Sequence, residues 1–343
     1  MVSLEEFKRV RVRSFKEVYA LVDERMRSIT DRSVGARRLV GDEKIRRVLT
    51  AKLRVSCETV REELGRVEEA VSLVKSMGEF YAKLFELYTR LDLDALLGKL
   101  RRSRRLAGRI EEDYASRLRS AGTRREAVAS FREGLGRCLS LYKRLNRDVL
   151  RVKQGVAELA KMPSVKGDYV VVIAGMPQVG KSTLLSKLTR AKPEIGMFPF
   201  TTKTIIVGHW QSEYGTVVFV DTPGILDRPV DEMNEIELKA VYAVKYLADA
   251  AIYVFDANPN SYYSLEQQLK TYNTVRSLLG DKPVIAVLNK VDVLREDELE
   301  ELARELGEKV SGGLVRVSAL KELNLDYLKR VVLERLTAGR RPP

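Results

Sequence analysis

With 343 residues, a mass of 38.9 kDa and 45% apolar residues, the chain is long enough for two domains with hydrophobic cores, which excludes a mostly disordered protein. No apolar run approaches the ~18 residues of a membrane-spanning helix, and residues 1–7 include Glu5 and Glu6 in place of an apolar leader, so we expect a cytoplasmic protein with no membrane partner. The formal net charge is +13, and two cysteines with a single histidine, His209, argue against a disulfide framework, a metal cluster and a Ser/His triad.

Residues 1–163 are predicted to form an all-α antiparallel bundle, because their apolar residues recur at spacings of three and four. Ser3 with Glu6 and Thr123 with Glu126 match the capping-box pattern, and Pro163 ends the last helix. The predicted helices cover about residues 3–29, 42–64, 66–91, 92–118 and 123–162.

The positive charge is concentrated in this first half. Residues 1–166 hold 39 Lys and Arg against 24 Asp and Glu, a balance of 39 − 24 = +15. Residues 167–343 hold 61 − 39 = 22 basic and 48 − 24 = 24 acidic residues, a balance of −2. This asymmetry favours contact between the first half and a polyanion, with nucleic acid as the first candidate and an anionic membrane surface as the second.

Residues 164–343 are predicted to form an α/β domain with a mostly parallel, doubly wound sheet. Short apolar runs alternate with amphipathic segments, which is typical of a sheet covered by helices on both faces. The predicted strands cover residues 169–174, 205–209, 217–220, 251–255, 284–288 and 314–317, and the predicted helices cover residues 182–190, 234–247, 265–279, 296–310 and 323–336.

The strongest motif follows the first of these strands. Residues 175–182 match G-x-x-x-x-G-K-[ST] between a buried strand and a helix, which predicts a phosphate-binding P-loop. Glycines let backbone N–H groups surround phosphate oxygens, and the helix start adds partial positive charge. Lys181 is expected to reach the β- and γ-phosphates and Ser182 to bind Mg²⁺. The predicted phosphate-binding residues are Gly175, Met176, Pro177, Gln178, Val179, Gly180, Lys181, Ser182 and Thr183.

Two later motifs indicate guanine as the base. Asn289-Lys290-Val291-Asp292 follows a strand, and the Asp292 carboxylate can accept from both the ring N–H and the exocyclic amine of guanine. Adenine offers no such pair of donors. Asn289 is expected to hold the loop and meet the base, and the Lys290 stem to lie against the ring. Residues Ser318, Ala319 and Leu320 follow the last strand and can offer backbone N–H groups to the guanine carbonyl.

Two further segments are predicted to respond to the γ-phosphate. Asp221 is expected to hold Mg²⁺, and the Gly224 N–H to contact the γ-phosphate. Thr201 and Thr202 lie in the preceding loop, and we expect Thr202 to close over Mg²⁺ when GTP is bound. The predicted catalytic residues are Lys181, Thr202 and Gly224, and the predicted Mg²⁺ ligands are Ser182, Thr202 and Asp221.

Ile225 stands where many GTPases place a glutamine that orients the attacking water. An isoleucine cannot orient water by hydrogen bonding, so we expect slow hydrolysis without an activator. The missing group could be borrowed from elsewhere. His209 is the obvious substitute within the chain, but its place at the end of a strand favours a structural role instead.

A family resemblance extends over nearly the whole chain. Phe200-Thr-Thr202, the run Asp221–Pro229 and Asn234–Glu237 resemble the Nog-type nucleolar GTP-binding proteins of the Obg-like group of translation-factor-related GTPases. Residues 80–84, 100–106 and 159–164 are similar to that family's N-terminal helical domain. The resemblance implies a P-loop GTPase domain after a helical bundle, a role in assembly of the large ribosomal subunit, and binding to ribosomal RNA. The end at Pro343 is similar to short, archaeal-type members. Potassium-stimulated relatives have Asn where this chain has Gln178, which argues against a potassium requirement.

Basic side chains on two predicted helices are candidates for RNA contact, because their spacing aligns guanidinium groups on helical faces. A solvated charged surface is the alternative interpretation. The RNA-contact candidates are Arg101, Arg102, Arg104, Arg105, Arg109, Lys143, Arg144, Arg147 and Arg151.

The sequence thus favours a monomeric, Mg²⁺-dependent GTPase that acts as a nucleotide-switched assembly factor. Two alternatives remain open. The chain could be a non-enzymatic clamp on RNA or protein that uses GTP as a structural ligand, or a GTPase subunit that supports an RNA-modifying partner.

Overall fold

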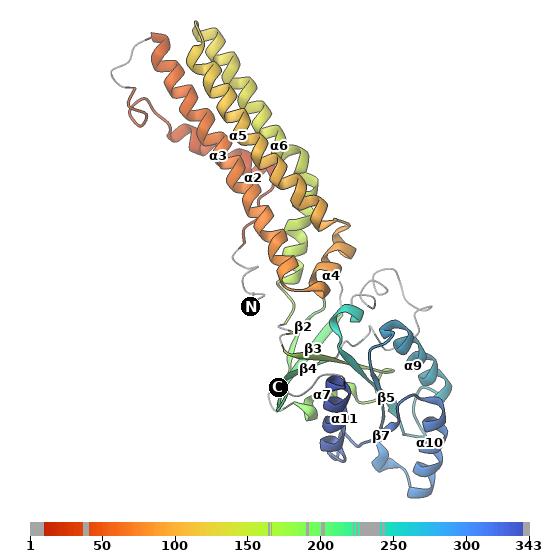
Figure 1. Cartoon of the computed structure of the whole chain (residues 1–343). Coiled ribbons are helices and arrows are strands. Elements are labelled where there is room, and N and C mark those ends of the chain that lie inside the picture. Colours follow the sequence, from red (N-terminus) through yellow and green to blue (C-terminus); the bar gives the residue numbers. More distant parts are fainter. Residues whose placement is uncertain are drawn as a thin grey trace. The chain divides into compact units, whose positions relative to one another are not determined.

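The computed structural model describes residues 10–36, 41–163, 165, 167–189, 192–199, 203–221, 223, 226, 241 and 244–338. The chain divides into two compact units, residues 1–160 and 161–343. Figure 1 shows a helical first unit and a second unit built around a sheet.

The first unit is a helical bundle, as predicted. Three long helices pack pairwise along one another, and two shorter helices, α2 and α4, contact them (Figure 1). The helices are α2 (Phe15–Ser28), α3 (Gly41–Ser76), α4 (Glu79–Thr89), α5 (Leu93–Ser120) and α6 (Arg124–Leu159). Tyr114 of α5 and Tyr142 of α6 are among the largest fully buried side chains of this core.

Helix caps decide where several of these helices begin. Asp92 caps α5 by accepting from Ala95 N at 2.8 Å. Thr123 caps α6 by accepting from Glu126 N at 3.2 Å, as the sequence predicts for Thr123. In a complete capping box Glu126 would accept from the backbone N–H of Thr123. Its Oε2 instead accepts from Gly122 N at 2.9 Å.

Three predicted helix boundaries in this unit are wrong. The predicted helix 66–91 is interrupted at residues 77–78, where Gly78 has a φ of +110° and separates α3 from α4. Residues 10–14 are not helical, and α2 begins at Phe15 because Ser14 and Glu17 form a complete capping box. Ser3 and Glu6 lie outside the described residues. The predicted break near residue 65 does not occur, because α3 continues through Gly65 with Leu64 and Val67 buried on either side of it. Burial of this stripe outweighs the ~1 kcal/mol that a helical glycine costs.

The second unit is built on a seven-stranded sheet of order β2-β3-β4-β1-β5-β6-β7. Its strands are β1 (Tyr169–Ala174), β2 (Glu194–Met197), β3 (Thr204–Ser212), β4 (Gly215–Asp221), β5 (Ala250–Asp256), β6 (Val284–Asn289) and β7 (Leu314–Arg316). Strands β4, β1, β5, β6 and β7 are parallel, whereas β2 and β3 run antiparallel at one edge. The predicted mostly parallel sheet is confirmed. Strand β2 was not predicted, because it is only four residues long, contains Gly196 and depends on its pairing with β3.

Helices cover both faces of this sheet. Ile252 and Val254 of β5 share one core cluster with Leu184 of α7 (Lys181–Leu188) and Leu328 of α11 (Leu325–Thr337). The alternate residue Tyr253 turns to the opposite face and packs edge-to-face with Tyr272 of α9 (Leu265–Leu279), with ring centroids 5.4 Å apart. Helix α10 (Glu296–Lys309) packs against β7. Of the predicted helix 234–247, residues 241 and 244–247 are described and helical.

Candidate functional site

The carboxyl ends of five parallel strands meet at one edge of the sheet. The chain runs from β1 to the β4 side first and later to β5 on the other side of β1, so the strand order reverses at β1. Ligands of open α/β sheets bind in the crevice at such a reversal. The segments that follow β1, β4, β6 and β7 carry the predicted phosphate, Mg²⁺ and base residues.

Two glycines shape the loop that follows β1. Gly175 has a φ of +141°, and a Cβ there would lie 2.5 Å from the carbonyl oxygen of Val254. Gly180 has a φ of +99°, and a Cβ there would lie 2.4 Å from Nδ2 of Asn289. Any larger residue at either position would therefore displace neighbouring backbone or the buried Asn289 amide.

Lys181 is the first residue of α7 and its side chain is buried. Its Nζ donates to the carbonyl oxygens of Gly175 at 2.8 Å and Met176 at 2.9 Å. The ammonium group therefore lies against the loop that the sequence identifies as the phosphate-binding loop. Because the loop also ends at the N-terminus of α7, the positive end of a helix dipole reinforces this charge.

A hydroxyl and a carboxylate meet beside this loop. Ser182 Oγ donates to Asp221 Oδ2 at 2.6 Å, and Asp221 is fully buried at the end of β4. Oxygen ligands of this kind suit Mg²⁺, so the residues present fit the predicted metal. Gly175 N donates to the carbonyl oxygen of Leu226 at 3.1 Å, which places Leu226 next to the same loop. Thr201, Thr202, Gly224 and Ile225 lie outside the described residues.

Asn289 holds three loops together. Its Nδ2 donates to the Val179 carbonyl oxygen at 2.9 Å, and its Oδ1 accepts from Ala319 N at 2.9 Å. The side chain is almost completely buried. The two ends of a single amide thus join the P-loop, the β6 loop and the β7 loop, which were predicted from separate motifs.

Lys290 adds a second connection, through an acidic residue that sequence analysis missed. Its Nζ donates to the Gln178 carbonyl oxygen at 2.9 Å and to Asp256 Oδ2 at 2.7 Å. The Asp256 side chain is 4% exposed, and its backbone N–H donates to Gln268 Oε1 at 2.8 Å. The available signal was an acidic residue at the end of the wholly apolar run of β5.

The remaining base-binding candidates differ in exposure. Asp292 is exposed on the short 3₁₀ helix Val291–Val293, which leaves its carboxylate accessible. Ser318 is buried, and its Oγ accepts from Lys321 N at 3.1 Å, which shapes the loop after β7. Leu320 is 72% exposed. Thr183 is exposed on α7.

His209 lies away from this edge. It pairs with Val218 in the β3–β4 ladder, three positions along β4 from Asp221, or about 10 Å at the rise of a strand. This position agrees with the structural role expected from the sequence.

The RNA-contact candidates of the bundle fall into two groups. Arg101 Nε and Arg104 Nη1 bind the two oxygens of Glu68 at 2.8 and 2.7 Å. Burial alone would raise the pKa of Glu68, but these two hydrogen bonds lower it. In the second group Arg151 is half-buried and the other side chains are exposed. The exposed ones are Arg102, Arg105, Arg109, Lys143, Arg144 and Arg147.

Across the part of the chain that the structure describes, no three or more His, Cys, Asp or Glu residues gather in a group that could hold a metal ion by themselves, and no helix is both long and apolar enough to cross a bilayer.

Two regions of the chain match known families. Residues 8–166 match the family described as the NOG1 N-terminal helical domain, and residues 170–290 match the family described as 50S ribosome-binding GTPase. An uncharacterized protein of Methanocaldococcus jannaschii is 34% identical over 258 residues, which cover 75% of this chain and 72% of that protein.

Eukaryotic relatives match a longer part of this chain. Nucleolar GTP-binding protein 1 of Eremothecium gossypii is 28% identical over 303 residues, 87% of this chain and 47% of that protein. The protein of the same name from Drosophila melanogaster is 29% identical, over 87% of this chain and 46% of its own length. The chain thus spans about half the length of these nucleolar relatives.

Proposed function

This chain belongs to the NOG1 family of P-loop GTPases, and we propose that it binds GTP with Mg²⁺ at the carboxyl edge of its sheet and hydrolyses GTP to GDP and phosphate. The bound nucleotide would control its attachment to ribosomal RNA during assembly of the large ribosomal subunit. Relatives named nucleolar GTP-binding protein 1, and the family described as ribosome-binding GTPase, support the ribosomal part of the proposal.

The observation that carries the nucleotide part is the amide of Asn289. Its bonds to Val179 and Ala319 bring the phosphate-binding loop and both base-binding loops to one place. A single purine nucleotide could therefore contact all three. Asp292 is exposed beside them and would accept from the ring N–H and the amine of guanine, which gives selectivity against adenine.

Ser182 and Asp221 would hold Mg²⁺ from α7 and β4, and the sequence adds Thr202 as a third ligand. When bound, Mg²⁺ would neutralise charge on the β- and γ-phosphates. Lys181 would exchange its bonds to the loop carbonyls for phosphate oxygens. Because Ile225 offers no hydrogen bond to water, hydrolysis by the isolated monomer would be slow.

Nucleotide binding is tested by titrating the full chain with fluorescent GTP. Lys181→Ala and Ser182→Ala should each weaken binding by more than tenfold. The matched control is Lys187→Ala, which also removes a lysine from α7 but one that is paired with Glu322 outside the site. Unchanged affinity in the first two variants would refute the P-loop assignment.

The ribosomal part is tested by sedimentation with large ribosomal subunits and their precursors. The full chain should sediment with particles in the presence of a non-hydrolysable GTP analogue and be released with GDP. Equal recovery in both nucleotide states would contradict a nucleotide-switched assembly factor.

A further inference from the structure

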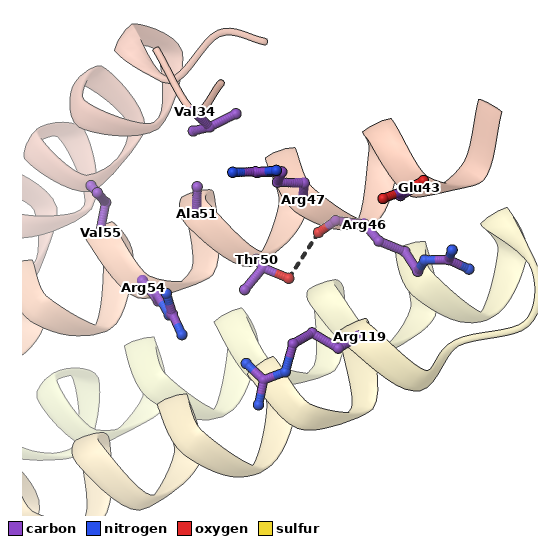
Figure 2. A pocket seen from close by; sticks show the side chains of 9 residues that line it. All are labelled: Val34, Glu43, Arg46, Arg47, Thr50, Ala51, Arg54, Val55 and Arg119. Carbon is purple, nitrogen blue, oxygen red and sulfur yellow. Dashed lines mark hydrogen bonds between the residues drawn. The ribbon is translucent and has the colours of Figure 1, made fainter. Parts of the chain in front are cut away.

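A basic pocket opens between α3 and α5, beside the beginning of α3 and the end of α5 (Figure 2). Its volume is about 720 Å³. Arg46, Arg47 and Arg54 of α3 and Arg119 of α5 line it, together with a single carboxylate, Glu43. The balance is 4 − 1 = +3, so the pocket favours an anionic ligand.

These guanidinium groups differ from other arginines that lie between helices of the bundle. Arg13 is paired with Glu63 at 2.7 Å, and Arg101 and Arg104 are paired with Glu68. None of the four pocket arginines forms an ion pair within the described residues. Four cations that share a single carboxylate repel one another on balance, so the stability of the bundle does not account for the whole set.

Part of the pocket is held in place by hydrogen bonds. Arg46 Nη1 donates to the carbonyl oxygen of Ala121 at 2.7 Å, beyond the end of α5. Thr50 Oγ1 donates to the Arg46 carbonyl oxygen at 2.8 Å, the bond drawn as a dashed line in Figure 2. Arg54 and Arg119 are exposed and come from two different helices. A ligand held by both would therefore bridge α3 and α5.

The spacing of the arginines fits a strand of phosphates better than a single phosphate. Arg47 and Arg54 are seven residues apart on α3, which is about 10.5 Å along the helix axis. One strand of a nucleic acid carries a charge about every 3.4 Å of helix rise, so several phosphates fall within that length. The half-buried side chains of Val34, Ala51 and Val55 line the same pocket and offer an apolar surface to a base.

We propose that this pocket binds a short segment of single-stranded RNA, with phosphates on the four arginines and one base against the apolar wall. The proposal rests on the proposed function, in which the chain contacts ribosomal RNA, and it assigns a place for that contact. Guanidinium groups bind phosphate oxygens in a bidentate manner, and their planes also stack on unpaired bases.

The test measures binding of a fluorescently labelled single-stranded oligoribonucleotide to the full chain, by anisotropy at several salt concentrations and without GTP. Arg54→Gln combined with Arg119→Gln removes two charges from the pocket. The matched control combines Arg27→Gln with Arg137→Gln, which removes two exposed arginines of the same unit outside the pocket. Circular dichroism establishes that both variants keep their helices.

We expect the pocket variant to lose more than tenfold in affinity and the control less than about threefold. The slope of log affinity against log salt should flatten by about 1.4 in the pocket variant, since each contact to a single strand contributes ~0.7. Equal losses in the two variants would overturn the proposal. So would displacement of the RNA by a nucleoside monophosphate at the same nucleotide concentration, because the pocket would then hold one nucleotide and not a strand.

The same two variants separate this proposal from the proposed function. If both sediment with ribosomal particles in a GTP-dependent way and bind RNA equally, the assembly function stands and the pocket assignment fails. A second outcome is that only the pocket variant loses RNA affinity, while the unmodified chain sediments with particles equally well with the GTP analogue and with GDP. The assignment of RNA to the pocket is then supported, and the nucleotide-switched function is contradicted. A pocket variant that loses particle binding but keeps its RNA affinity would point to an acidic protein segment and overturn the RNA assignment.

Discussion

Asp256 shows how one buried charge can position another residue. Its carboxylate is 4% exposed and lies 2.7 Å from Lys290 Nζ, which also binds the Gln178 carbonyl oxygen. The ion pair therefore fixes the stem that was expected to lie against the base. Asp256→Asn keeps the shape but removes the charge, and leaves the Lys290 ammonium with one carbonyl partner in this network.

We expect Asp256→Asn to weaken GTP binding by about tenfold, or ~1.4 kcal/mol, because hydrogen bonds between charged groups contribute ~1.5–3 kcal/mol and Lys290 is partly exposed. Calorimetric titration measures the change. Asp281→Asn, which removes an exposed carboxylate just beyond α9, is the control and should leave binding unchanged. An unaltered affinity in Asp256→Asn would show that Lys290 needs no such positioning.

Asp292 leads to a prediction about which base the site selects. In the proposed function the exposed carboxylate would accept from two donors of guanine, whereas an amide can donate to the second carbonyl of xanthine. Asp292→Asn should therefore lower the affinity for GTP and raise the affinity for xanthosine triphosphate. Competition of both nucleotides against fluorescent GTP measures the ratio, and retained guanine selectivity would remove Asp292 from base recognition.

At the scale of the elements, close packing of helices can be tested with glycines. A Cβ at Gly155 of α6 would lie 2.5 Å from a ring carbon of Phe85 on α4, whereas a Cβ at Gly136 of the same helix would meet nothing within 4 Å. Gly155→Ala should destabilise the protein by ~1–3 kcal/mol through overpacking. Gly136→Ala should stabilise it by ~0.5–1 kcal/mol, because alanine is the better helix former.

Chemical denaturation of the two variants, monitored by the circular dichroism of the helices, measures whether the free energy of unfolding falls in Gly155→Ala and rises in Gly136→Ala. If Gly155→Ala were as stable as Gly136→Ala, the close approach of α4 and α6 would be refuted.

A pH-dependent contact joins α2 to α6. Hydrogen bonds from Lys153, together with those from Ser14, lower the pKa of Glu17 from 4.5 to about 2. A lowered folded-state pKa gives stability that is complete above the unfolded value of about 4.5 and is lost as the pH falls toward about 2. The side chain is 42% exposed, so solvent screening keeps the contribution below ~1 kcal/mol.

Glu17→Gln keeps a capping side chain and removes the charge. It should lower the thermal midpoint by about 2 °C at pH 7, with the difference from the unmodified chain narrowing between pH 5 and pH 2. Glu24→Gln on the same helix removes an exposed carboxylate and should show no such narrowing. A constant difference across that range would contradict the lowered pKa.

Sequence patterns predicted most elements of both units, because each strand or helix carries its own apolar period. They failed where the deciding contact is distant in sequence. The continuity of α3 through Gly65 depends on the buried stripe that packs on α5 and α6, and β2 depends on pairing with β3. The ion pair of Asp256 with Lys290 could not be predicted for the same reason, since the two residues are 34 positions apart in the sequence. Single motifs predicted a phosphate loop and two base loops, but none of them indicated the ion pair between Lys290 and Asp256.

At the scale of the whole molecule, the distribution of charge bears on where a polyanion would bind. The predicted cluster at residues 101–105 is partly neutralised, because Arg101 and Arg104 bind Glu68. The pocket around Arg54 and Arg119 has no such neutralisation within the described residues. Neutralising Arg101 and Arg104 together should therefore flatten the salt dependence of RNA binding less than neutralising Arg54 and Arg119. Anisotropy titrations of the two double variants compare the slopes directly.

Hydrolysis is the property that separates a switch from a clamp. The residue after Gly224 is Ile225, which cannot orient water, so the P-loop, Ser182 and Asp221 alone should support only slow single-turnover hydrolysis. A group supplied by the ribosomal particle would complete the site and accelerate the reaction, as activating residues supplied by a partner do in other GTPases.

We therefore expect large ribosomal subunits or their precursors to raise the single-turnover rate by at least tenfold, and small subunits to leave it unchanged. The measurement follows phosphate release from prebound GTP, with Ser182→Ala as the inactive control. A rate that no particle accelerates would favour a clamp in which GTP is a structural ligand, because such a clamp needs the nucleotide to remain bound and not to be cleaved.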